Sequence, residues 1–255
     1  MYMPKKLEIL ELIKRSVNFV LVGTTHPGNI GAAARAIKNM GIHNLILVAP
    51  SDFPHEKAFF RAKSASDILE NAIIFETLEE AVKDSNYVIG TSARNRKVPW
   101  PLVTPKQCSN ELVSFIKQQD SKISVVFGRE DRGLTNKELG LCNLHVHIPS
   151  SDEYPSLNIS QAIQILAYEI RLSALSVKGP LKEQSWDVPL AQNKEVEKLI
   201  EHFDELMKEI KFYETENPRQ LLTRVRRFFK RTRLDRMEVN IFRGVLAAIQ
   251  KKLKE

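Results

Sequence analysis

The sequence predicts an α/β protein with a mostly parallel sheet, followed by a small helical extension at the carboxyl end. Short apolar runs alternate with helical patterns through residue 175, as is typical of a parallel sheet covered by helices. Beyond residue 193 only helical patterns follow. With 255 residues, 43% of them hydrophobic, the chain is long enough to bury its own core.

The expected strands are short apolar runs that end at glycine, proline or a polar loop. Residues 17–22 (VNFVLV) stop at Gly23, and residues 45–49 (LILVA) stop at Pro50. Continuous apolar runs of this length favour strands that are buried on both faces. In chain order, we expect strands at residues 17–22, 45–49, 73–75, 87–92, 122–128 and 144–149.

Segments with helical composition lie between these strands. Residues 30–40 end at Gly41, a natural stop for a helix. A long amphipathic pattern covers residues 160–175 and places Ile163, Leu166, Ile170 and Leu175 on one face. The other expected helices cover residues 56–72, 78–85, 109–119 and 134–142.

The chain divides into three parts. Residues 1–175 are expected to form one α/β domain, and residues 176–193, with Gly179, Pro180 and Pro189 but no periodicity, a linker. Two or three helices are expected in residues 194–255.

Positive charge is concentrated at the carboxyl end. Residues 219–255 hold twelve lysines and arginines against three acids, a net charge of +9, while the rest of the chain carries −2. A basic appendage on a near-neutral body indicates a polyanionic partner. The alternative is a solvated amphipathic helix.

Several other classes of protein are excluded. The two cysteines, Cys108 and Cys142, are too few for a disulfide scaffold or a four-cysteine zinc site. Cys142, His145 and His147 lack a fourth ligand, so no metal is expected. No apolar run reaches the roughly 20 residues of a membrane helix. The amino terminus, broken by acidic residues, does not resemble a signal peptide, and we expect a cytoplasmic protein that does not bind membranes.

Four polar loops follow predicted strands, at the edge where an open α/β sheet binds its ligands. In residues 23–35, Gly23 and Gly28 have the spacing of a phosphate-binding loop. Asn29 and Ile30 stand where that loop needs lysine and a hydroxyl, which disfavours a nucleoside triphosphate. Asn29 is expected to cap the following helix, which would bring Arg35 toward the site.

The other three loops are also rich in polar and small residues. Residues 127–136 (FGREDRGLTN) place Gly128 and Glu130 at a strand end, and a local salt-bridged turn is the alternative interpretation. Residues 148–160 place Ser156, Asn158 and Ser160 before a long helix, where they can satisfy its first-turn N–H groups. Residues 90–100 begin with small side chains that let a ligand approach the backbone.

Three segments, taken in order, closely resemble the motifs of the SpoU branch of the SPOUT RNA methyltransferases. They are Asn29 with Arg35, FGREDRGL at residues 127–134, and IPSSDEYPSLNISQA at residues 148–162, and the match extends over residues 17–175. The tail at residues 224–246 resembles the C-terminal extension of a tRNA methyltransferase in this branch.

The resemblance implies a SPOUT fold with a deep trefoil knot at the cofactor site, a homodimer, and S-adenosylmethionine (SAM) as methyl donor. It also implies 2′-O-methylation of ribose in tRNA, at a cytidine or uridine at the 5′ edge of the anticodon loop, position 32. One alternative is methylation of ribose in ribosomal RNA. Another is a catalytically inactive RNA-binding protein, which would bind tRNA without SAM.

Carried over by motif, the resemblance places Arg35 and Asn29 at the ribose and makes Glu130 the organiser of the catalytic site. Arg35 acts either as general base or as a cation that holds an RNA phosphate and stabilises alkoxide charge. The implied SAM-binding residues are Thr91, Ser92, Ala93, Gly128, Ile148, Ser156, Leu157 and Asn158.

The same resemblance implies that the tail binds tRNA through phosphate contacts. Phe228 and Phe229 interrupt the basic cluster, and we expect both to be buried anchors, with platforms for base stacking as the alternative. The residues expected to contact phosphate are Arg224, Arg226, Arg227, Lys230, Arg231 and Arg233.

Overall fold

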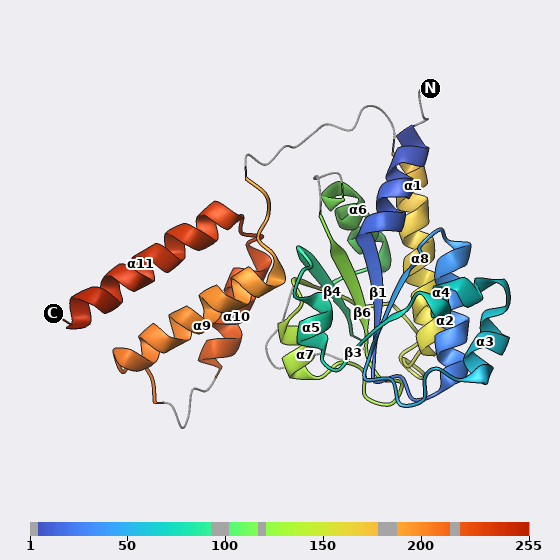
Figure 1. Cartoon of the computed structure of the whole chain (residues 1–255), viewed down its shortest axis with the longest axis horizontal. Coiled ribbons are helices and arrows are strands. Elements are labelled where there is room, and N and C mark those ends of the chain that lie inside the picture. Colours follow the sequence, from blue (N-terminus) through green and yellow to red (C-terminus); the bar gives the residue numbers. More distant parts are fainter. Residues whose placement is uncertain (1–4, 93–101, 117–120, 178–187, 215–219, 255) are drawn as a thin grey trace.

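The computed structural model describes residues 5–92, 102–116, 121–177, 188–214 and 220–254 (Figure 1). Its centre is a seven-stranded sheet in which every described pairing is parallel. The strands are β1 (Val17–Val22), β2 (Asn44–Val48), β3 (Ile73–Phe75), β4 (Tyr87–Thr91), β5 (Leu102–Val103), β6 (Ile123–Phe127) and β7 (Leu144–Val146). Their order across the sheet is β3-β2-β1-β6-β4-β7-β5.

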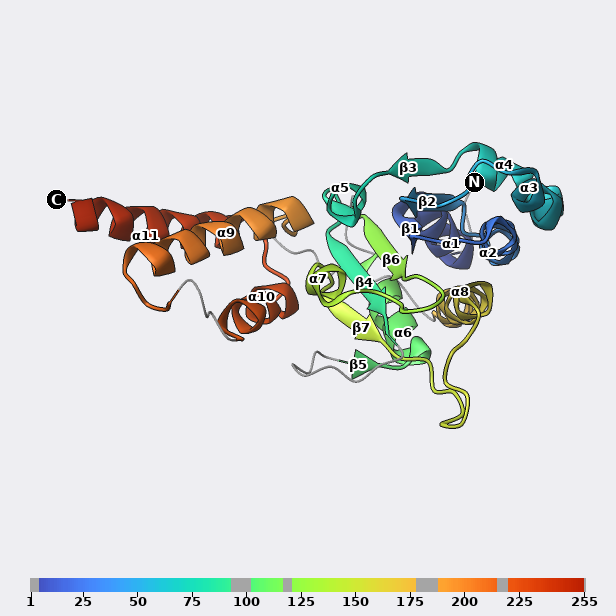
Figure 2. The same ribbon diagram turned by 90° about the horizontal axis from the view of Figure 1, so that it is seen from below.

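Helices cover both faces of this sheet (Figures 1 and 2). One face is covered by α1 (Lys5–Ser16), α2 (Pro27–Asn39), α6 (Pro105–Phe115) and α8 (Ile159–Ser176). Outside α2 lie α3 (Glu56–Ala62) and α4 (Ser66–Glu70), while α5 (Leu78–Val82) and α7 (Asn136–Gly140) cover the opposite face. The predicted α/β architecture is therefore confirmed.

Side chains alternate between the two layers along each central strand. In β1, Phe19 and Leu21 belong to the core under α2 and α8, whereas Val20 and Val22 belong to the core under α5 and α7. All four are almost fully buried. A strand buried on both faces reads as a continuous apolar run, which explains why these strands were visible in the sequence.

The differences from the sequence prediction lie at element boundaries and in short elements. The helix expected at residues 109–119 is α6, which begins at Pro105 because Thr104 and Gln107 form a capping box. The helix expected at residues 56–72 breaks at Lys63, whose φ is +54°. Neither α1 nor the two-residue β5 was predicted from the sequence.

Three helices follow at the carboxyl end, α9 (Asn193–Glu209), α10 (Leu221–Arg231) and α11 (Arg236–Lys254). Helices α9 and α10 lie beside α5 and α7, α11 packs on α9, and the three enclose an apolar core of their own (Figures 1 and 2). That core contains Ala191, Val196, Leu199, Ile200, Leu206, Phe229, Leu234, Val239 and Leu246. The predicted helical extension is thus confirmed, while most of the expected linker, residues 178–187, lies outside the described residues.

A buried ionic cluster holds α10 against α9 and against the α/β domain. The fully buried Lys230 Nζ lies 2.8 Å from Glu197 Oε1, and Arg226 pairs with the same carboxylate. Lys230 also bonds Asn193, and its carbonyl accepts a 2.9 Å bond from Asn143 of the α/β domain. Burial alone would raise the pKa of Glu197, but the two cations hold it below its usual value. Lys230, expected to contact RNA, is instead enclosed in the protein.

We expect Glu197→Gln to lower the free energy of unfolding by about 3–5 kcal/mol, because it leaves Lys230 buried without a counter-charge. Lys230→Met should cost less, since Glu197 keeps Arg226. The pKa of Glu197 is depressed in the folded state, so its contribution is present at neutral pH and disappears as the pH falls through that pKa. The difference in free energy of unfolding between wild type and Glu197→Gln should therefore become smaller below about pH 4.

Urea unfolding of wild type, Glu197→Gln and Lys230→Met at pH 7 and pH 3.5 measures both effects. Equal midpoints for the three proteins at pH 7 would contradict this account of the cluster.

Candidate functional site

The carboxyl ends of β4, β6 and β7 meet at one edge of the sheet and border a cavity of about 310 Å³. We call it the strand-end cavity. Its lining consists of Thr91, Ser92, Phe127, Gly128, Arg129, Glu130, Asp131, Arg132, Gly133, Val146, Ile148, Pro155, Ser156, Leu157, Ile159 and Ala162. Six of the eight residues expected to bind SAM lie in this lining. Of the other two, Asn158 borders it in sequence and Ala93 lies outside the described residues.

Gly128 allows the loop after β6 to fold back on itself. A Cβ at this position would lie 2.2 Å from the backbone of Gly133 and Leu134. Arg129 and Gly133 exchange backbone hydrogen bonds across the loop, 3.3 and 2.9 Å long, and Gly133 has a φ of +67°. The loop is therefore closed tightly at the mouth of the cavity, in a way that only glycine at position 128 permits.

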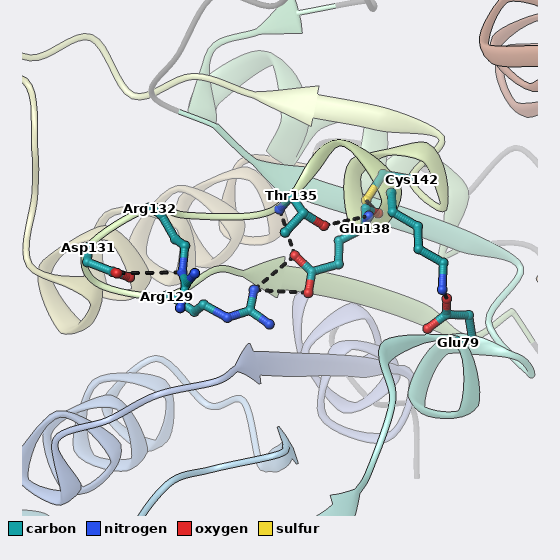
Figure 3. A network of polar contacts seen from close by, with 8 residues as sticks. Glu79, Arg129, Asp131, Arg132, Thr135, Glu138 and Cys142 are labelled. Carbon is teal, nitrogen blue, oxygen red and sulfur yellow. Dashed lines mark hydrogen bonds and ion pairs between the residues drawn. The ribbon is translucent and has the colours of Figure 1, made fainter. Parts of the chain in front are cut away.

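Side chains anchor this loop to α7 (Figure 3). Arg129 Nη1 donates to both carboxylate oxygens of Glu138, at 3.0 and 3.1 Å. Glu138 in turn forms a capping box with Thr135 at the start of α7. Arg129 is thus held by a residue nine positions away. The Thr-x-x-Glu spacing indicates the capping box at the start of α7, but no pattern in the sequence indicates that Glu138 also binds Arg129.

Neighbouring charges in the same network are more exposed. Asp131 and Arg132 form a 3.5 Å pair at the surface, which matches the local salt-bridged turn considered as an alternative for this loop. Lys137 pairs with Glu79 of α5 at 2.8 Å (Figure 3). Exposed pairs of this kind contribute at most about 1 kcal/mol, so the arrangement depends mainly on Arg129 and Glu138.

A chain of hydrogen bonds joins the three motif loops. Glu130 Oε1 accepts a 3.0 Å bond from Asn29 Nδ2, and its Oε2 accepts bonds of 3.3 and 3.4 Å from Thr25. Asn29 Oδ1 accepts a 3.1 Å bond from Asn158 Nδ2. Asn158 Oδ1 accepts from the backbone N–H of Ser160 at 2.9 Å and so caps α8. Loops more than 100 positions apart are therefore fixed to one another.

The structure corrects the role expected for Asn29. His26 is the N-cap of α2, and its Nδ1 accepts a 3.1 Å bond from the backbone N–H of Gly28. Pro27 follows at the first helical position. Asn29 lies inside the first turn, and its side chain is used for the bridge between Glu130 and Asn158.

Arg35 does not line the strand-end cavity. It is exposed on α2 and borders a neighbouring cavity of about 260 Å³. We call this the basic cavity, and its lining residues are Ala32, Arg35, Ala36, Asn39, Arg61, Ser160, Gln161 and Gln164. The first turns of α8 separate the two cavities, because Ile159 and Ala162 face one and Ser160 and Gln161 face the other. Arg61 was not anticipated from the sequence.

The basic residues of the tail divide into two groups. Arg226, Lys230 and Arg233 are engaged within the protein, Arg233 through a 2.6 Å contact with Glu111 and a position over the Tyr87 ring. Arg224 and Arg231 are exposed on α10, and Arg227 is half-buried.

The expectation for the two phenylalanines was half right. Phe229 is buried in the core of the extension, as expected. Phe228 is 48% exposed, which corrects its assignment as a buried anchor.

One ring nitrogen of each histidine beside Cys142 contacts a backbone carbonyl oxygen. His145 Nε2 lies 3.1 Å from the carbonyl oxygen of Leu139, and His147 Nδ1 lies 3.3 Å from that of Ser92. Within the described ranges, no group of three or more metal-ligating side chains is found. In the same part of the chain, no helix is long and apolar enough to cross a bilayer.

Comparison with known families places two matches along the chain. The model of the SpoU rRNA Methylase family matches residues 16–168, which include all three motif loops. The model of the C-terminal domain of the tRNA methyltransferase TrmJ matches residues 194–255.

Individual proteins resemble the chain over most of its length. It is 43% identical over 242 residues to the tRNA (cytidine/uridine/adenosine-2′-O-)-methyltransferase TrmJ of Pseudomonas aeruginosa strain UCBPP-PA14, covering 92% of this chain and 94% of that protein. It is 39% identical to the tRNA (cytidine/uridine-2′-O-)-methyltransferase TrmJ of Yersinia pestis strain Pestoides F, and the match covers 94% of this chain and 93% of that protein. The crystal structure of TrmJ from Z. mobilis ZM4 superposes on this chain with a TM-score of 0.78 at 29% identity. The superposition covers 91% of this chain and 98% of that one.

The bridge through Asn29 predicts a loss of stability in Asn29→Asp. This variant loses the donor to Glu130 and places two carboxylates side by side, so we expect the free energy of unfolding to fall by about 1–3 kcal/mol at pH 7. Thermal unfolding at pH 7 measures this loss, with the exposed Asn240→Asp on α11 as control. Equal melting temperatures for the two variants at pH 7 would show that the bridge contributes nothing.

Proposed function

Since this chain belongs to the SpoU rRNA methylase family, we propose that it transfers a methyl group from SAM to the ribose 2′-hydroxyl of a tRNA nucleotide. The nucleotide proposed is the cytidine or uridine at the 5′ edge of the anticodon loop. The observation that carries the proposal is the hydrogen-bonded bridge between the three motif loops, through Glu130, Asn29 and Asn158, beside a cavity that the second and third loops line. The tRNA methyltransferases named TrmJ support the choice of substrate, since they match this chain at 39–43% identity.

The lining of the strand-end cavity suits SAM in its chemistry. Apolar side chains such as Ile148, Pro155 and Leu157 provide a surface for a purine, and polar groups of Thr91 and Ser92 lie beside them. The missing side chain at Gly128 lets the loop after β6 close on itself at the edge of this cavity. With Ile148 and Ser156 in the same lining, and with Ala93 and Asn158 carried over by motif, these residues would hold the cofactor. Bound there, SAM supplies an electrophilic methyl group.

The residues of this chain then have to place the ribose and stabilise the charge that develops on its oxygen. Holding reacting groups in line can contribute roughly 7–11 kcal/mol. Glu130 fixes Asn29 at 3.0 Å and so sets the orientation of its amide at the edge of the cavity. Arg35 supplies a positive charge one and a half turns further along α2. Arginine stays protonated in proteins, and we therefore favour a role for Arg35 in binding phosphate and stabilising the alkoxide over a role as general base.

The remaining parts of the chain fit the same proposal. Residues 1–175 would form the catalytic domain, 176–193 a linker and 194–255 a tRNA-binding extension. The phosphate contacts of the extension are proposed for Arg224 and Arg231, which are exposed on α10, because Arg226, Lys230 and Arg233 are engaged within the protein. A trefoil knot at the cofactor site, a homodimer and a cytoplasmic location complete the proposal, and all three rest on the resemblance to the family.

Mass spectrometry of nuclease-digested tRNA, after incubation of an unmodified transcript with the protein and SAM, tests the proposal directly. A 2′-O-methyl nucleotide at the 5′ edge of the anticodon loop is the expected product. The family model is described for rRNA methylases, so ribosomal RNA is the second substrate to test. Methylation of ribosomal RNA but not of tRNA would show that the substrate is ribosomal RNA. Binding of tRNA without binding of SAM would identify an inactive RNA-binding protein.

Arg35→Lys should reduce turnover at saturating SAM by about 100-fold, the size of effect seen when one charge-stabilising donor is lost. Lysine keeps the charge but lacks the planar fork that binds phosphate bidentately. The affinity for SAM, measured by calorimetry, should not change because Arg35 lies outside the strand-end cavity. Near-normal turnover in this variant would rule out an essential role for the guanidinium.

Gly128→Ala should weaken SAM binding at least ten-fold, because the added Cβ meets the backbone at 2.2 Å and the loop has to move. The matched control is Gly244→Ala on α11, where no atom lies within 4 Å of the added Cβ. Calorimetric titration of SAM into both variants measures the effect. Wild-type affinity in Gly128→Ala would show that this loop does not shape the cofactor site.

A further inference from the structure

Two arginine side chains border the basic cavity. Among the described residues, no hydrogen bond or ion pair engages the guanidinium group of Arg35 or of Arg61, and both side chains are exposed. The lining holds no carboxylate. Two like charges that share one cavity are stabilised when an anion lies between them. The cavity therefore has the charge of an anion site.

Close packing of α3 against α2 sets the position of Arg61. A Cβ at Gly31 would lie 2.0 Å from the carbonyl oxygen of Ala58 and 2.9 Å from Arg61 Cβ, so only glycine permits this approach. Gly31 and Arg35 are four positions apart on α2 and lie on the same face of the helix. The backbone of Arg61 thus lies about one helical turn from that of Arg35, on α3, which packs beside α2 (Figure 1).

Neutral hydrogen-bonding groups complete the cavity. Asn39, Ser160, Gln161 and Gln164 present amides and a hydroxyl beside the two guanidinium groups. Its volume of about 260 Å³ lies below the roughly 300–1,000 Å³ typical of small-molecule sites, which favours a small group over a whole nucleotide. Guanidinium groups match phosphate oxygens in bidentate geometry. These features together point to a phosphodiester group.

We propose that Arg61 acts with Arg35 to bind one backbone phosphate of the RNA substrate in the basic cavity. This inference rests on the proposed function, because it assumes an RNA substrate. Ser160 and Gln161 face the basic cavity, while their neighbours Ile159 and Ala162 face the strand-end cavity. A phosphate held here lies directly beside the site of methyl transfer. Arg61 therefore positions the strand, and it does so from a helix that none of the three motifs includes.

The test compares Arg61→Gln with Lys57→Gln in the full-length protein. Lys57 is exposed on the same helix, one turn away, and does not line the cavity. We expect Arg61→Gln to weaken tRNA affinity about ten-fold and to reduce the slope of log affinity against log salt by about one, as for one lost phosphate contact. Lys57→Gln should change tRNA affinity less than two-fold, and SAM affinity should stay within two-fold of wild type in both variants.

Arg61→Lys adds a second measurement, since lysine keeps the positive charge but lacks the planar guanidinium group that binds phosphate with two hydrogen bonds. An affinity between those of wild type and Arg61→Gln supports a bidentate phosphate contact. Unchanged tRNA affinity and salt slope in Arg61→Gln, or an equal loss in Lys57→Gln, would overturn the proposal. Absence of a methylated product from the wild type would count against the proposed function. The tRNA affinity of the Arg61 variants could still be interpreted, because it is measured without methyl transfer.

Discussion

The bridge from Glu130 through Asn29 to Asn158 is the interaction on which the arrangement of the site depends. A carboxylate only accepts hydrogen bonds, and Glu130 receives them from Thr25 and Asn29. Asn29 then uses its oxygen for Asn158, which caps α8 with its own oxygen. Each amide is thus used as donor and acceptor at once. The loop after β1, the loop after β6 and the start of α8 are held in one geometry.

The parallel sheet makes this bridge possible. Since all described strands run in the same direction, the loops that follow β1, β4, β6 and β7 emerge at one edge. Glycine provides the space that these loops need. Gly128 lets its loop close on itself, Gly23 leaves room for Arg129, and Gly31 lets α3 reach α2. The first two shape the edge of the strand-end cavity, and the third places Arg61 beside Arg35 in the basic cavity.

The basic residues of the tail fall into two groups that the sequence does not distinguish, those that attach the extension to the α/β domain and those that stay at the surface. Arg226 and Lys230 share the carboxylate of Glu197, and Arg233 is held by Glu111 of the α/β domain. These residues attach the extension to the body. Arg224 and Arg231 remain at the surface. A positive charge of +9 in residues 219–255 is therefore partly internal, and fewer cations are available to a polyanion than the sequence suggests.

The amino-acid sequence by itself determined the α/β class, most strands, the long helix ending near residue 175 and the loops that carry the site. Strands buried on both faces and an amphipathic helix leave periodic patterns that can be read locally. Only the tertiary structure decided that Asn29 bridges Glu130 and Asn158, that Lys230 is buried, and that Arg61 lies beside Arg35. These facts depend on which helices pack together and at what distance, and contacts between residues far apart in the chain leave no periodic signal in one sequence.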